Sequence, residues 1–209
     1  MSLFKIENVN FLNILFYKDI EIKDDITFLV GESGAGKTTL LKLLNGSLSP
    51  VSGNVYYKNQ NIKDMDKLML RKEVVLVSQR IFLFHASVKE NFQIYYDYIK
   101  RKAPSDDEIV EFLKICEIDI DIKRDVSNLS GGEKQRVYNA IALSFKPKVL
   151  LMDEPTSSLD FETGKNFLEN IFSYSRKNNI KLVIISHDRN LVDELHENII
   201  YIEKSVKNE

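Results

Sequence analysis

The sequence predicts an α/β fold with a mostly parallel sheet core, an N-terminal antiparallel β portion and an inserted helical subdomain. Short apolar runs rich in Val, Ile and Leu alternate with helical patterns, which is typical of a parallel sheet with helices on both faces. Residues from about 81 to 130 interrupt this alternation with helices and loops. We therefore expect a single domain over residues 1–209, with its core at about 1–80 and 131–209 and the helical subdomain at about 81–130.

The elements follow in chain order. Leu3–Ile22 and Asn54–Tyr57 look like antiparallel strands, and between them Ile26–Val30 is a buried strand. A glycine loop and a leucine-rich helix come next, and the Asn-Gly pair at 45–46 is a helix stop signal. Further apolar strands and amphipathic helices are predicted at Val74–Val77, Val149–Met152, Leu182–Ile185, Asp106–Cys116, Glu133–Leu143 and Phe161–Lys177.

Composition excludes several classes of protein. Hydrophobic residues make up 44% and charged residues 29%, which suits a soluble chain with a sizeable core. The formal net charge of −2 argues against a broad basic footprint, so no nucleic-acid partner is expected. No apolar run approaches the roughly 20 residues that span a bilayer, and the N-terminus lacks the pattern of a signal peptide. The single cysteine, Cys116, lies on a helical apolar stripe and is expected to be a packed core thiol.

The most specific motif is the segment GESGAGKT at Gly31–Thr38, which lies between a predicted strand and a predicted helix. It matches the phosphate-binding loop of P-loop NTPases, in which glycines let the backbone amides surround phosphates. Lys37 is expected to reach the β- and γ-phosphates and Thr38 to ligate Mg²⁺. The alternative is a plain glycine-rich turn, which needs neither the lysine nor the hydroxyl. The predicted nucleotide contacts are Gly31, Glu32, Ser33, Gly34, Ala35, Gly36, Lys37, Thr38 and Thr39.

Two acids end the apolar strand KVLLMDEP at 148–155. The carboxyl ends of parallel strands face the ligand crevice of an α/β fold. Asp153 is therefore expected to hold Mg²⁺, and Glu154 is the candidate general base that polarises the attacking water. The alternative is that both acids merely begin a turn before Pro155.

The segment LSGGEKQR at Leu129–Arg136 looks like a helix opening, although its glycines place it before the helix interior. A serine hydroxyl and two glycine amides at a helix N-terminus form an anion site, which predicts nucleotide contacts from Ser130, Gly131 and Gly132. Two anion sites in one chain suggest a head-to-tail homodimer, in which each ATP lies between the phosphate loop of one copy and Ser130–Gly132 of the other. An ordinary glycine-rich helix entry is the alternative.

In these motifs and their order, the sequence resembles the ATP-binding subunit of an ATP-binding cassette (ABC) transporter from about Leu3 to Ile202. GESGAGKT resembles the Walker A loop, VLLMDE the Walker B strand and LSGGEKQR the signature motif. The resemblance implies further roles for three residues. Gln79, in VSQRIFLF, would contact Mg²⁺ and water, Asp160, in SSLD, would couple the two sites, and His187, in ISHD, would contact the γ-phosphate.

The sequence departs from the family near its start, where most members stack adenine on an aromatic residue. Asn13 falls at that position, and Phe11, Phe16 and Tyr17 are the nearby candidates. The two remaining histidines, His85 and His196, match no motif and are expected to be surface or subdomain residues.

The resemblance also implies partners and a place in the cell. The chain lacks a predicted membrane span, so a separate integral membrane permease would hold it at the cytoplasmic face of the membrane. The apolar run Ile81–Phe84 either lines a groove for a permease helix or belongs to the subdomain core. The compact length resembles the ATPases of small bacterial exporters. The alternative function is a soluble ABC-type ATPase acting on nucleic acid or ribosomes, although members of that class carry coiled-coil insertions or two cassettes. A P-loop kinase or GTPase has no use for LSGGEKQR.

Overall fold

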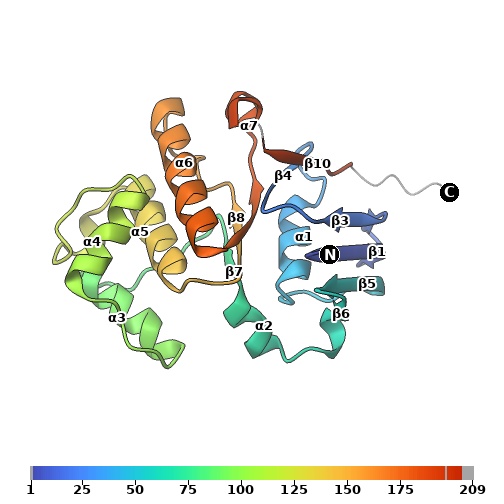
Figure 1. Ribbon diagram of the computed structural model, residues 1–209, viewed down its shortest axis with the longest axis horizontal. Helices are drawn as coiled ribbons and strands as arrows, with labels where there is room; N and C mark the ends of the chain where they lie inside the picture. The colour runs from blue at the N-terminus through green and yellow to red at the C-terminus, as the bar shows by residue number, and fades with distance from the viewer. Residues whose placement is uncertain (1, 196, 204–209) are drawn as a thin grey trace.

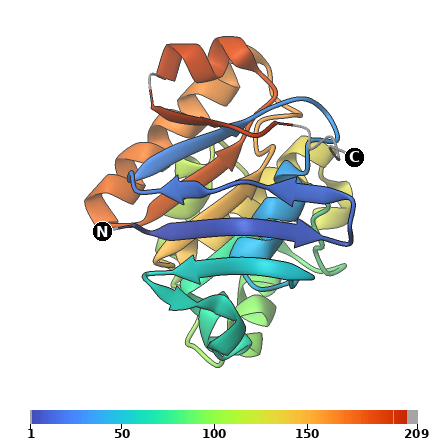
Figure 2. The same cartoon turned by 90° about the vertical axis from the view of Figure 1, so that its right-hand side faces the viewer.

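The structure is a computed structural model and describes residues 2–195 and 197–203. Its elements lie in layers, with an antiparallel sheet at one end, a parallel sheet in the middle and helices α3 (Val88–Tyr98) and α4 (Asp106–Ile115) at the other end (Figure 1). Figure 2 looks onto the antiparallel sheet, behind which the helix α1 (Lys37–Leu44) lies. The predicted α/β class is confirmed.

The parallel sheet has five strands in the order β10-β4-β9-β8-β7. Neighbouring strands all run parallel, as their runs of Val, Ile and Leu predict. This order places the carboxyl ends of β7, β8 and β9 next to one another, although the strands are far apart in the sequence. Their bounds are β4 Ile26–Val30, β7 Val74–Val77, β8 Val149–Asp153, β9 Lys181–Ile185 and β10 Asn198–Tyr201, the last of which lies outside the predicted strands.

The N-terminal segments form the predicted antiparallel sheet. Its central strand, β1, pairs with β2, β3 and β5, and a register shift interrupts the pairing with β5 between Glu7 and Asn10. β5 also pairs with β6. The bounds are β1 Phe4–Phe11, β2 Leu15–Tyr17, β3 Ile20–Ile22, β5 Ser52–Tyr57 and β6 Gln60–Asn61.

Two apolar clusters hold the layers together, one on each face of the parallel sheet. Alternate residues of each strand face opposite sides, so that in β8 Leu151 packs with α1 and the antiparallel sheet while Leu150 packs with the helices beyond the other face. Helices therefore cover both faces, as predicted. The remaining helices are α2 Lys67–Glu73, α5 Gly131–Ser144, α6 Phe161–Asn178 and α7 Arg189–Leu195, with short 3-10 turns at Ile62–Asp64 and Val126–Asn128.

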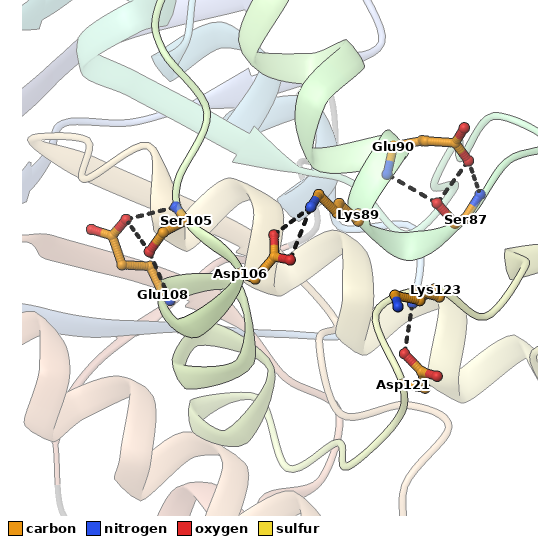
Figure 3. A network of polar contacts seen from close by, with 8 residues as sticks. All are labelled: Ser87, Lys89, Glu90, Ser105, Asp106, Glu108, Asp121 and Lys123. Carbon is orange, nitrogen blue, oxygen red and sulfur yellow. Dashed lines mark hydrogen bonds and ion pairs between the residues drawn. The ribbon is translucent and has the colours of Figure 1, made fainter.

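Residues 81–130 contain α3 and α4, which pack on α5 and share its core cluster. Each of the two helices begins with a serine whose side chain and backbone exchange hydrogen bonds with a glutamate three residues later, and an ion pair of 2.6 Å between Lys89 and Asp106 joins the helices (Figure 3). The boundaries of a separate subdomain at 81 and 130 stay a prediction.

Candidate functional site

The predicted phosphate loop connects β4 to α1, which is the context that its motif requires. Lys37 opens α1, and its buried ammonium donates to the backbone carbonyl oxygens of Gly31 at 2.8 Å and Glu32 at 2.9 Å. Burial lowers the pKa of Lys37, while the negative charges of Glu154 and Asp153 oppose that shift. The lysine is therefore fixed inside the loop, close to both strand-end acids.

Gly36 is the position where the loop requires glycine. Its φ is 93°, and a Cβ there would lie 2.5 Å from the hydroxyl oxygen of Tyr17. That hydroxyl donates to the Gly36 carbonyl at 2.8 Å, and burial raises the pKa of Tyr17. The antiparallel sheet thus supports the loop through a buried tyrosine.

Gly36→Ala is expected to lower stability by about 1–2 kcal/mol, because alanine is strained at positive φ. For a chain of this size the melting temperature should fall by roughly 2–8 °C in a thermal unfolding scan. Gly131→Ala is the matched control, since nothing lies within 4 Å of a Cβ added in that first helical turn. Equal melting temperatures for the two variants would contradict the strained conformation assigned to Gly36.

Asp153 ends β8 and is only 3% exposed. The Thr38 hydroxyl donates to its Oδ1 at 3.1 Å. Burial raises the pKa of Asp153, because a carboxylate loses hydration in that position. The two residues predicted from separate motifs to bind Mg²⁺ are therefore in contact, and both offer the oxygen ligands that Mg²⁺ prefers.

Three predicted catalytic residues meet at the adjoining ends of β7, β8 and β9. His187 Nε2 lies 2.7 Å from Glu154 Oε1, and Gln79 Nε2 donates to Glu154 Oε2 at 3.2 Å. Each follows its strand by at most two residues, so the strand order brings the side chains together. Glu154 adopts a φ of 54°, which is rare for a residue other than glycine.

Ser130 caps α5. Its hydroxyl accepts the Glu133 N–H at 3.2 Å, and its own N–H donates to Glu133 Oε2 at 2.7 Å. The helix begins at Gly131, two residues before the predicted start, so Gly131 and Gly132 form its first turn rather than a preceding loop. The S-x-x-E pattern within LSGGEKQR is a capping-box signature that could have located this start.

The other predicted nucleotide contacts lie in the phosphate loop, at the start of α1 and before α6. Glu32, Ser33, Gly34 and Thr38 are exposed, whereas Ala35 is buried and Thr39 is half-buried. Asp160 caps α6, where its Oδ1 accepts the Thr163 N–H at 3.0 Å, and its role across a dimer stays a prediction.

The residues outside the motifs divide as follows. Among the adenine candidates, Tyr17 is buried, Phe16 is half-buried and Phe11 packs against the core. Asn13, which occupies the family's aromatic position, lies in a turn with a φ of 56°. His85 is exposed, with its Nδ1 at 3.3 Å from the Ser127 hydroxyl, and His196 lies outside the described residues. Cys116 is fully buried as predicted, and burial raises its pKa. Gln135, a buried contact of the Glu154 backbone, is a site residue that sequence reasoning missed.

In the part of the chain that the structure describes, no helix has both the length and the apolar character needed to cross a bilayer.

Comparisons with known proteins identify the family of the chain. A family profile described as "ABC transporter" matches residues 21–157. The chain is 32% identical over 201 residues to the probable iron export ATP-binding protein FetA of Escherichia coli K12, covering 91% of this chain and 87% of that protein. It is 33% identical over 190 residues to the methionine import ATP-binding protein MetN of Clostridium tetani, where it covers 88% of this chain but only 60% of that protein.

The fold also matches a solved cassette. The dimeric structure of MJ0796, a bacterial ABC transporter cassette, superposes with a TM-score of 0.80 at 27% identity, covering 96% of this chain and 94% of that one. The same cassette in a dimeric post-hydrolysis state with ADP and Pi gives a TM-score of 0.79 at 27% identity, with 97% of both chains covered. Agreement in sequence and in fold along most of its length shows that this chain belongs to the ABC transporter family, as one of its ATP-binding cassettes.

Proposed function

We propose that the chain hydrolyses ATP with Mg²⁺, and that ATP closes two copies of it head to tail to power a separate membrane permease. One observation carries this proposal, namely the contact of Glu154 with both Gln79 and His187 beside the phosphate loop. A carboxylate, an amide and an imidazole that converge from three strand ends suit the activation of water next to a bound terminal phosphate.

Each group has a proposed task in the reaction. The amides of residues 31–36 and the Lys37 ammonium bind the β- and γ-phosphates. Thr38 and Asp153 would hold Mg²⁺, with Gln79 as a further contact, and the ion would neutralise charge on the phosphate oxygens.

Glu154 accepts a proton from water as the water oxygen attacks the γ-phosphorus and the bond to the β-phosphate oxygen breaks, which leaves ADP and phosphate. His187 donates a hydrogen bond to the γ-phosphate and positions it for that attack.

The proposed closed dimer uses the start of α5. Ser130 and Gly131 are exposed and Gly132 is half-buried, so a phosphate of a nucleotide bound to a second copy could reach the start of the helix. The positive end of the 14-residue helix favours that anion. The MJ0796 likeness supports this reading, because that cassette was solved as a dimer.

Ser130→Arg is expected to block ATP-dependent dimerisation while leaving ATP binding to the monomer within about twofold, because the long side chain fills the space for the partner's phosphate. Dimer formation would be followed by light scattering in the Glu154→Gln background, with ATP present. Ser105→Arg is the matched control, since Ser105 heads α4 with the same capping box. Both changes should cost about 1 kcal/mol of cap stability, but only Ser130→Arg should prevent closure. A Ser130→Arg protein that dimerises normally with ATP would contradict the proposed interface.

The proposed permease surface lies directly after Gln79. Phe82 is 62% exposed and packs edge-to-face on Phe84, with the two ring centroids 4.9 Å apart. Phe84 in turn stacks on Tyr98, which is 72% exposed. Leu83, in contrast, packs against the core. The run Ile81–Phe84 therefore contributes to the core through Leu83 and to the surface through Phe82. An exposed aromatic cluster beside Gln79 suits an apolar helix of a permease, which we place at the cytoplasmic face of the membrane.

Affinity-tagged Glu154→Gln would be purified from solubilised membranes in the presence of ATP and Mg²⁺. One multi-span membrane protein should co-purify with it. Phe82→Glu should lose that partner while keeping ATP-dependent dimerisation. Recovery of ribosomal or DNA-repair proteins in place of a membrane protein would overturn the transporter assignment.

Export is the proposed direction of transport. The chain covers 87% of the probable iron export protein FetA but only 60% of the methionine import protein MetN.

A further inference from the structure

The backbone of Glu154 is held in an unfavourable conformation. Its φ of 54° is sterically unfavourable for a residue with a Cβ. The following residue is Pro155, which further restricts the backbone that precedes it. Such conformations persist only where the surroundings fix them, and they cluster at functional sites. The contacts around this residue therefore determine where its carboxylate points.

Three hydrogen bonds surround the Glu154 peptide groups. Its N–H donates to the Ile185 carbonyl at 3.1 Å. Its carbonyl oxygen accepts the Ser157 N–H at 3.3 Å and the Gln135 Nε2 at 3.2 Å. Of these three partners, only Gln135 uses a side chain, so it is the one contact that a substitution can remove without changing the local backbone.

Gln135 is itself oriented by its neighbours. It is 8% exposed, and its Oε1 accepts the Ser158 hydroxyl at 3.3 Å. Because the Oε1 faces that hydroxyl, the amide nitrogen faces the Glu154 carbonyl. Ser158 also lies beside the start of α5, since its Oγ would be 3.1 Å from a Cβ added at Gly132. The amide thus joins α5, the turn after β8 and the backbone of the proposed base.

We propose that Gln135 is a positioning residue for ATP hydrolysis. It fixes the Glu154 backbone so that the carboxylate lies between Gln79 and His187, and it ties that backbone to the helix headed by Ser130. Gln135 follows Ser130 by little more than one helical turn, so a phosphate bound at the helix start would act on the same rigid segment. This inference rests on the proposed role of Glu154 as the general base.

Gln135→Glu tests the hydrogen bond to Glu154 separately from the hydrogen bond to Ser158. The glutamate keeps an oxygen that accepts from Ser158, but it places a second oxygen against the Glu154 carbonyl in place of an N–H donor. Gln135→Met removes both bonds at similar volume. Gln93→Met is the matched control, because it makes the same chemical change at an exposed glutamine of α3 that donates to Asp97 rather than to Glu154.

Steady-state hydrolysis, ATP binding and thermal unfolding would be measured for all three variants. We expect Gln135→Glu and Gln135→Met to lower kcat at least tenfold with ATP affinity within twofold of the wild type, because small displacements of a catalytic group have large effects on rate. Gln93→Met should leave kcat unchanged. A purely structural role would lower the melting temperature and leave kcat of the folded fraction unchanged, which would overturn the inference.

The same substitutions in the Glu154→Gln background test whether Gln135 affects the rate through Glu154. If Gln135 acts through Glu154, adding Gln135→Met there should lower the residual single-turnover rate less than twofold, since the two changes share one cause. A full additional tenfold loss would overturn the inference. If Glu154→Gln alone keeps the wild-type kcat, the proposed function itself fails. If Glu154→Gln is inactive but both Gln135 variants hydrolyse ATP normally, only the positioning role fails.

Discussion

Glu154→Gln is expected to bind ATP with near-normal affinity and to hydrolyse it about 10² to 10⁴ times more slowly, the contribution typical of a positioned general base. The glutamine keeps the size of the side chain and one oxygen that can accept from His187 or Gln79. It cannot accept a proton from water. ATP should therefore stay uncleaved, and the closed dimer should accumulate.

The measurement is steady-state phosphate release, together with light scattering in the presence of ATP and Mg²⁺. Glu73→Gln serves as the control, because it makes the same chemical change at an acid that contacts Tyr57. Its kcat should equal that of the wild type. A Glu154→Gln enzyme that hydrolyses ATP at the wild-type rate would exclude Glu154 as the base.

Lys37→Ala is expected to weaken ATP binding by roughly 10- to 100-fold, which corresponds to about 1.5–3 kcal/mol for a hydrogen bond to a charged group. The ammonium lies inside the loop on the carbonyl oxygens of Gly31 and Glu32, where it is close to the site of the phosphates. Its loss removes a positive charge that interacts with Glu154 and Asp153, so these two acids would face the anionic ligand with less compensation.

Isothermal titration of ATP into the monomer would measure this loss. Lys37→Met keeps the apolar stem of the side chain, so an equal loss in both variants assigns the effect to charge rather than packing. Lys63→Ala, which removes an exposed lysine outside the site, should leave the affinity unchanged. ATP affinity within twofold of the wild type in Lys37→Met would contradict the assignment.

Local sequence signals predicted much of the fold because the relevant physics is local. The apolar runs at Ile26–Val30 and Val74–Val77 are strands with those bounds, since runs of branched residues suit buried parallel strands. The phosphate loop was predicted from its own eight residues. The glycines predict a start of α5 two residues too late, because they argue against helix while the capping pattern within the same motif marks its true beginning.

Long-range contacts at the site could not be predicted in the same way. The contact between Gln79 and Glu154 joins residues 75 positions apart, and it exists because β7 and β8 are neighbours in the sheet. No residue pattern in the chain encodes that neighbourhood, so the roles of Gln79 and His187 came from the family resemblance. Gln135 was missed for the same reason, since a glutamine on a helix carries no sign of the carbonyl it contacts.

The cap on α5 also sets the direction of the Ser130 hydroxyl. One lone pair of its oxygen is taken by the Glu133 N–H, and the oxygen lies at the head of a helix whose other free amides also donate. The Ser130 N–H and hydroxyl also contact the Glu133 carboxylate, and these contacts lower the pKa of Glu133, so this end of the helix carries an acidic group among its donors. The positive end of the helix dipole attracts an anion, whereas the carboxylate repels it. A phosphate at this helix start would therefore be held by directional hydrogen bonds from the amides rather than by net charge.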